Sequence, residues 1–145
     1  MNNSDKAMSM FRKDGYYCCQ AVFTTLGEQL GINRNLALKM STGFGAGIAG
    51  RGDICGAVSG AIMAIGLKYG NVEGHDVEAR NKAFFLTQEL IERINARHGC
   101  YTCRGLTGID FTKPDGIKLY EKRGIEEKVC LKIIKECVDT VEEIW

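Results

Sequence analysis

The cysteines are the residues of this chain that could do chemistry. The sequence of 145 residues contains seven, at positions 18, 19, 55, 100, 103, 130 and 137. A thiolate is both a nucleophile and a soft metal ligand, so thiols can exchange disulfides, bind zinc or hold an iron–sulfur cluster. An odd number cannot be fully paired within one chain. Seven is also more than a hydrophobic core readily absorbs as small apolar side chains. The count favours metal binding or redox chemistry.

Four of the cysteines form two pairs, and helical spacing allows only one cysteine of each pair to face a shared site. Cys18 and Cys19 are adjacent, so on a helix they point about 100° apart and only one can face a shared site. Cys130 and Cys137 are seven residues apart, about 10 Å along a helix axis, so one metal centre can use at most one of them. We expect the other member of each pair to lie in the core.

The remaining cysteines complete a set of four thiols. Cys100 and Cys103 form a single C-x-x-C, which alone indicates half of a metal site or a reversible disulfide. Cys55 and one thiol from each of the three pairs together give four thiols from four separate segments. Four such thiolates could hold an iron–sulfur cluster or a zinc ion, or work as two redox pairs. Spacing does not choose among these alternatives.

The glycine-rich stretch before Cys55 matches the nucleotide-binding motif in its residue types but not in its expected structural context. Residues 45–50 read G-x-G-x-x-G, but that motif needs a strand before it and a helix directly after it. Packing explains the stretch better, since Gly52, Gly56 and Gly60 recur every four residues and would let another backbone approach. With Asp53 as the N-cap, Cys55 would lie in the first helical turn, where the unpaired N–H groups lower the pKa of a thiol.

The elements that must position these cysteines are helices. Apolar residues recur with helical periodicity and no segment alternates with a period of two, so no strand is expected. We predict helices over residues 4–13, 17–30, 33 or 35 to 40, 54–69, 76–97 and 126–144. In 76–97 the apolar stripe consists of Val77, Phe84, Ile91 and Ile94. Four phenylalanines are expected in the core and not as stacking partners of a cofactor: Phe44, Phe84, Phe85 and Phe111. Residues 99–116 are expected to be irregular. The result is an all-α fold, a compact bundle of about five or six helices, in one domain over residues 1–145.

Composition excludes several function classes. The net charge is +1 and gives no reason to expect nucleic acid as a partner. No apolar run is long enough to span a membrane, and the first residues lack an apolar signal core, so we expect a cytoplasmic protein. His98 is expected to act as a positive charge at a helix C-terminus. A face of small residues often serves self-association, so a homodimer remains open.

Several motifs resemble one known family. They are Cys18-Cys19-Gln20-Ala21-Val22, Gly43-Phe44-Gly45, Arg51-Gly52, Cys55-Gly56-Ala57-Val58-Ser59-Gly60-Ala61 and Cys103-Arg104-Gly105-Leu106. From residue 10 to the last helix, the chain resembles the C_GCAxxG_C_C family of redox-active proteins, whose hallmark is C-G-A-x-x-G with three further cysteines. The resemblance implies Cys18, Cys55, Cys103 and Cys130 as the site. Similar domains occur attached to multihaem modules, which implies electron transfer and an iron–sulfur centre.

Three hypotheses follow for function. In the first, the four cysteines bind an iron–sulfur cluster or a single metal ion, zinc or iron, and pass electrons to a redox partner protein. In the second, the protein is a thiol–disulfide oxidoreductase in which Cys55 attacks and another cysteine resolves. In the third, the chain is a helical module without catalysis whose cysteines fill the core.

Overall fold

The structure is a computed structural model that describes residues 1–145. It contains eight α-helices and no β-strand. The helices are α1 (Asn3–Arg12), α2 (Cys18–Gln29), α3 (Arg34–Ser41), α4 (Gly56–Tyr69), α5 (Val77–His98), α6 (Cys103–Thr107), α7 (Gly116–Lys122) and α8 (Leu131–Ile144). A short 3-10 helix, η1 (Thr42–Phe44), follows α3, and a π-helical turn, η2 (Glu126–Cys130), leads into α8.

The all-α prediction is confirmed, but the number of five or six helices is wrong. The additional helices are α6 and α7, which have five and seven residues and lie in or just after the segment expected to be irregular. Helices of one or two turns are too short to show an apolar period, so the sequence does not reveal them. The other six lie within two residues of the predicted bounds, except that the last begins as a π-helical turn.

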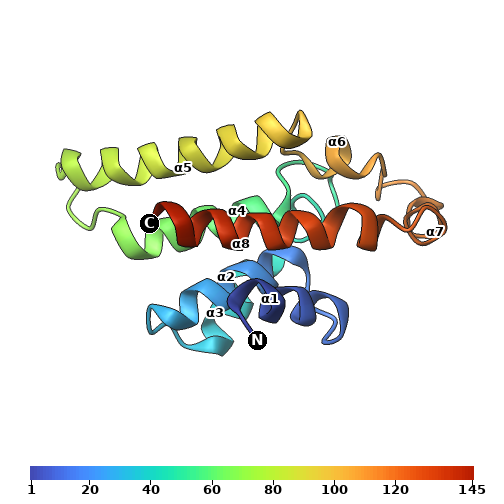
Figure 1. The fold of residues 1–145 in the computed structure, drawn as a ribbon, viewed down its shortest axis with the longest axis horizontal. Helices are drawn as coiled ribbons and strands as arrows, with labels where there is room; N and C mark the ends of the chain where they lie inside the picture. The colour runs from blue at the N-terminus through green and yellow to red at the C-terminus, as the bar shows by residue number, and fades with distance from the viewer.

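Helices α2, α4 and α8 form the centre of the molecule, and the other long helices cover them. Helix α1 packs on α8 and α2, α3 packs on α2, and α5 contacts α4 and α8. In Figure 1, α5 runs along one side of α8, α1 to α3 lie on the other side, and α6 and α7 gather at one end. The core between them is apolar and includes Leu26, Ile65, Leu90 and Ile134. None of the helices combines the length and apolar character that crossing a membrane requires.

Glycines let α2 and α4 approach closely, as the small-residue pattern predicted. A Cβ atom added at Gly60 would lie 2.9 Å from the carbonyl oxygen of Cys19 and 3.2 Å from the backbone nitrogen of Phe23. Gly56 faces the start of α2 in the same way. The prediction is wrong for Gly52, which precedes α4 and has a φ of +78° in the connecting loop.

The predicted apolar stripe of α5 is mostly wrong. Leu86, Leu90 and Ile94 are buried, whereas Phe84 and Phe85 are 60% and 64% exposed. The side chains at 86, 90 and 94 are four residues apart and share one face, and Phe84 and Phe85 point away from that face. Two apolar faces compete in this sequence, and the packing of α5 on α4 and α8 selects one.

The start of α3 provides a test of helix capping. The side chain of Asn33 accepts a hydrogen bond from the backbone N–H of Leu36 at 3.0 Å, so Asn33 is the N-cap and Asn35 is an exposed helical residue. Replacing Asn33 by alanine should lower the free energy of unfolding by about 1 kcal/mol. The same change at Asn35 should leave it unchanged or slightly higher, because alanine is the better helix former. Urea unfolding of both variants measures the difference, and equal effects would contradict the assignment.

Candidate functional site

Four of the seven cysteines line one small cavity. Cys18, Cys55, Cys103 and Cys130 surround a space of about 30 Å³. The other lining residues carry no charge: Gly56, Ala57, Leu106, Thr107, Val129 and Ile133. All the cysteines of the chain are free thiols. Thiols from four segments that are distant in the sequence therefore line the same cavity.

The other three cysteines lie elsewhere. Cys137 is fully buried in the hydrophobic core, and Cys19 is buried beside Ser59. Cys100 is partly buried and lies against Gly105, outside the cavity. One member of each sequence pair thus reaches the cavity, as helical spacing indicated.

Helix N-termini position three of the four thiols. Cys18 is the first residue of α2, Cys103 is the first residue of α6, and Cys55 is the N-cap of α4. The first N–H groups of a helix have no partner within it and favour negative charge nearby. Cys130 differs, because it ends the π-helical turn η2 within a continuous helical segment. The cavity is therefore placed where a cluster of thiolates would meet backbone donors.

A short backbone pairing holds Cys55 next to Cys103. The N–H of Cys55 donates to the carbonyl of Tyr101 at 2.8 Å, and the N–H of Cys103 donates to the carbonyl of Asp53 at 2.7 Å. Ile54 and Thr102 form an isolated antiparallel bridge between these bonds. This single bridge is all the β pairing in the chain, and it fixes two of the four cysteines relative to each other.

The glycine-rich stretch forms a left-handed turn beside Cys18. All five residues from Ala46 to Gly50 have positive φ, between +51° and +80°. This conformation costs about 1–2 kcal/mol for each residue that is not glycine, and Ile48 is β-branched. The N–H of Ala46 interacts with the Cys18 sulfur. A Cβ at Gly47 would lie 2.6 Å from the Cβ of Cys103, so the turn packs directly on the cysteine site. It follows a 3-10 helix and no strand, which agrees with our rejection of the nucleotide fingerprint.

Burial raises the pKa of all four thiols. It raises the pKa of Cys103 to about 11 and that of Cys130 to about 12. Burial also raises the pKa of Cys18, against the backbone N–H groups of Ala46 and Gly56, which favour the thiolate. The sulfur of Cys18 further raises the pKa of each of the other three, because a second negative charge in the cavity is unfavourable.

The predicted activation of Cys55 is wrong. Asp53 is not the N-cap of α4, and Cys55 itself occupies that position. Its pKa lies well above the ordinary value, because burial and the nearby Cys18 outweigh the backbone N–H groups of Ala57 and Val58. A helix N-terminus lowers the pKa of a thiol only where desolvation does not exceed its effect.

The sulfur atoms are not arranged for one metal ion. No group of three or more histidine, cysteine, aspartate or glutamate side chains surrounds a common point at ligand distance. A tetrahedral zinc site needs its sulfurs about 2.3 Å from the metal. An iron–sulfur cluster places its cysteine ligands on different iron atoms and so takes thiolates that lie further apart.

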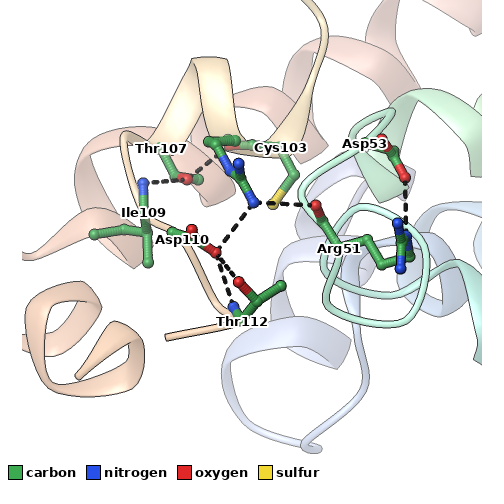
Figure 2. Close-up of polar contacts among 8 residues, drawn as sticks. Arg51, Asp53, Cys103, Thr107, Ile109, Asp110 and Thr112 are labelled. Atoms are coloured by element: carbon green, nitrogen blue, oxygen red, sulfur yellow. Dashed lines mark hydrogen bonds and ion pairs between the residues drawn. The ribbon is translucent and has the colours of Figure 1, made fainter. Parts of the chain in front are cut away.

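Polar contacts around Asp110 and Arg51 lie next to Cys103 (Figure 2). Nη2 of Arg104 donates to Oδ1 of Asp110 at 3.0 Å and to the carbonyl of Arg51 at 3.5 Å. The charge of Arg104 lowers the pKa of Cys103, against the effect of burial. The hydroxyl of Thr107 donates to the carbonyl of Cys103 at 2.7 Å. These contacts tie α6 to the loop before α4.

Tyr120 is a residue of the site that the sequence did not indicate. Burial raises the pKa of Cys130, and the nearby hydroxyl of Tyr120 acts in the opposite direction and lowers it. Tyr120 belongs to α7, a helix too short to be recognised from periodicity. His98 is the last residue of α5, as expected, and its Nε2 lies 2.6 Å from Glu136, away from the cysteines.

Comparison with known proteins identifies the family of this chain. A protein from Archaeoglobus fulgidus, described as "Uncharacterized protein", is 45% identical over 51 residues, which is 34% of this chain and 34% of that relative. No solved structure matches the chain. The model of one family, described as "Putative redox-active protein (C_GCAxxG_C_C)", matches residues 16–144. That range contains all four cysteines of the cavity and covers most of the chain, which therefore belongs to the C_GCAxxG_C_C family.

Proposed function

We propose that this protein transfers electrons through an iron–sulfur cluster held by Cys18, Cys55, Cys103 and Cys130. The observation that carries the proposal is the cavity itself, since thiols from four distant segments line it and no other titratable side chain does. Cysteine thiolates are the usual ligands of such clusters. The cluster would supply one-electron chemistry, with a redox protein as donor or acceptor.

Backbone N–H groups lie at two of the four sulfurs and partly offset the cost of burying negative charge there. The lining is otherwise uncharged, and the backbone N–H groups of Ala46 and Gly56 lie at Cys18, while those of Ala57 and Val58 lie at Cys55. Hydrogen bonds to ligand sulfurs stabilise the reduced, more negative state and so raise a reduction potential. The charge of Arg104 beside Cys103 acts in the same direction.

Thiol–disulfide exchange is the second candidate function, because four free thiols share one cavity. The reactivity of the thiols argues against this function. An attacking thiol works best when its pKa is near the ambient pH, and here burial raises the pKa of all four. The third hypothesis, cysteines as core filling alone, has to explain why four meet at a cavity while only Cys19 and Cys137 are fully buried.

Anaerobic purification tests the proposal directly. A brown protein with broad visible absorption and with iron and acid-labile sulfide bound to each chain is the expected result. A colourless protein with one bound zinc would replace the cluster with a structural metal site. A protein free of metal that loses two or four thiols on mild oxidation would support thiol–disulfide exchange.

The metal-free protein should show slow thiol alkylation at neutral pH. Burial raises the pKa of Cys103 to about 11 and of Cys130 to about 12, so the reactive thiolate is scarce at pH 8. We expect iodoacetamide to modify both at least tenfold more slowly than it modifies glutathione, read out residue by residue by mass spectrometry. Because their pKa values are raised, the rates should still increase with pH above 10, where the rate for glutathione has levelled off. A rate that levels off near pH 7 would favour the disulfide mechanism.

A further inference from the structure

A second cavity lies directly beside the cysteine site. It has a volume of about 380 Å³, within the usual range of about 300–1,000 Å³ for small-molecule sites. We call it the aromatic groove. Its walls are Tyr17, Thr42, Ile117, Phe111 and Tyr120, together with the left-handed turn at Gly45, Ala46, Ala49 and Gly50.

Two residues that line the aromatic groove also lie next to cysteines of the site. Tyr120 lines the groove, and its hydroxyl lies close enough to Cys130 to lower the pKa of that thiol. Ala46 lines the groove, and its backbone N–H interacts with the Cys18 sulfur. A molecule in the groove would be separated from two of the four sulfurs by one side chain or one peptide unit.

The residues that line the groove indicate the chemical class of ligand that it would bind. Phe111 and Tyr120 form a tilted pair with ring centroids 5.7 Å apart. The ring of Tyr17 lies against Gly45, where an added Cβ would come within 2.7 Å of it. Aromatic walls favour a planar ring. No lining side chain is charged, although 26% of the chain is charged, so the groove offers nothing to pair with a phosphate or carboxylate.

Apolar residues at the mouth of the groove remain open to solvent. Tyr17 is 55% exposed and Ile117 is 66% exposed. Exposed apolar side chains gathered at a cavity indicate a binding surface. They also leave the groove accessible to water, which a reaction that consumes protons requires.

We infer that the aromatic groove binds a neutral quinone that exchanges electrons with the cysteine site. This inference rests on the proposed function and names the class of its small-molecule partner. Reduction of the quinone to hydroquinone takes up two electrons and two protons. A cluster held by Cys18, Cys55, Cys103 and Cys130 would supply the two electrons one at a time and would be re-reduced by a reduced redox protein, while water at the groove mouth would supply the two protons.

Binding of 2,3-dimethyl-1,4-naphthoquinone tests this inference, because both ring carbons that thiols attack are blocked. Anaerobic isothermal titration of the protein as purified should show saturable binding of one quinone per chain. Phe111→Ala should weaken binding at least tenfold, since it removes one aromatic wall. Phe84→Ala removes an exposed ring on α5 and is the matched control, with unchanged affinity expected.

A second variant guards against misfolding of Phe111→Ala. Ile117→Arg changes an exposed side chain and places a charge at the groove mouth, so it should weaken binding at least tenfold while the circular dichroism spectrum stays unchanged. Tyr120→Phe keeps the ring and should retain the affinity. Absence of saturable binding up to about 1 mM quinone, or equal weakening by Phe84→Ala, overturns the inference.

The inference and the proposed function fail separately. A brown protein with iron that does not bind the quinone overturns the groove assignment alone. A colourless protein that binds the quinone, with the expected loss in Phe111→Ala, keeps the groove and overturns the cluster.

Discussion

Cys18→Ser is expected to abolish binding of the proposed iron–sulfur cluster, and with it the iron, sulfide and visible absorption that the proposal requires. Cys18 interacts electrostatically with each of the other three cysteines of the cavity, and backbone N–H groups from two other segments interact with its sulfur. Serine has nearly the same volume but is a poor ligand for iron in place of thiolate. Loss of one of four ligands should lower the iron bound per chain at least tenfold, measured by inductively coupled plasma mass spectrometry after anaerobic purification.

Cys100→Ser is the matched control for this experiment. Cys100 is partly buried, like Cys18, but it does not line the cavity. Its replacement should leave the iron content and the absorption spectrum unchanged. Cys137 would be a poor control, because a serine hydroxyl there would be buried in the core without a partner. If Cys18→Ser keeps its iron, or if Cys100→Ser loses it, the assigned ligand set is wrong.

Helix geometry could predict that only one cysteine of a close pair faces a shared site. Cys130 and Cys137 are seven positions apart, which is two helical turns, so only one of them can reach the cavity. The structure places Cys130 at the cavity and Cys137 in the core, and it was the family resemblance that indicated which of the two to expect there. The same reasoning separated Cys18 from Cys19. Neither argument needs the tertiary structure, since each uses only the rise and rotation per residue.

The surroundings of the site could not be predicted, because they depend on tertiary contacts that override local preference. Ala46, Ile48 and Ala49 adopt left-handed conformations that side chains with a Cβ normally avoid. Tyr120 reaches Cys130 from a helix of seven residues. The pKa of Cys55 likewise follows from its burial, which the position of a residue in the sequence does not give.

Gly56→Ala is expected to lower the free energy of unfolding by about 1–3 kcal/mol and to disrupt the cysteine site. A Cβ at this position would overlap the Cys18 sulfur and lie 3.0 Å from the backbone nitrogen of Cys19. The start of α2 would have to move, since backbone on that side of the contact cannot rotate away as a flexible side chain can. The iron bound per chain should fall together with stability, because the displaced sulfur is one of the four proposed ligands.

Gly66→Ala in the same helix separates this effect from a general effect of alanine. Gly66 is exposed, and an added Cβ would meet no atom within 4 Å. Alanine there should raise the free energy of unfolding by up to about 1 kcal/mol, because it is the better helix former. Urea unfolding and iron analysis of both variants measure the two effects. The close packing of Cys18 on Gly56 predicts opposite signs for the two stability changes, with iron lost only from Gly56→Ala. Equal stability changes would mean that α2 has room to move away from α4, and that the cavity is less rigid than the contact at Gly56 indicates.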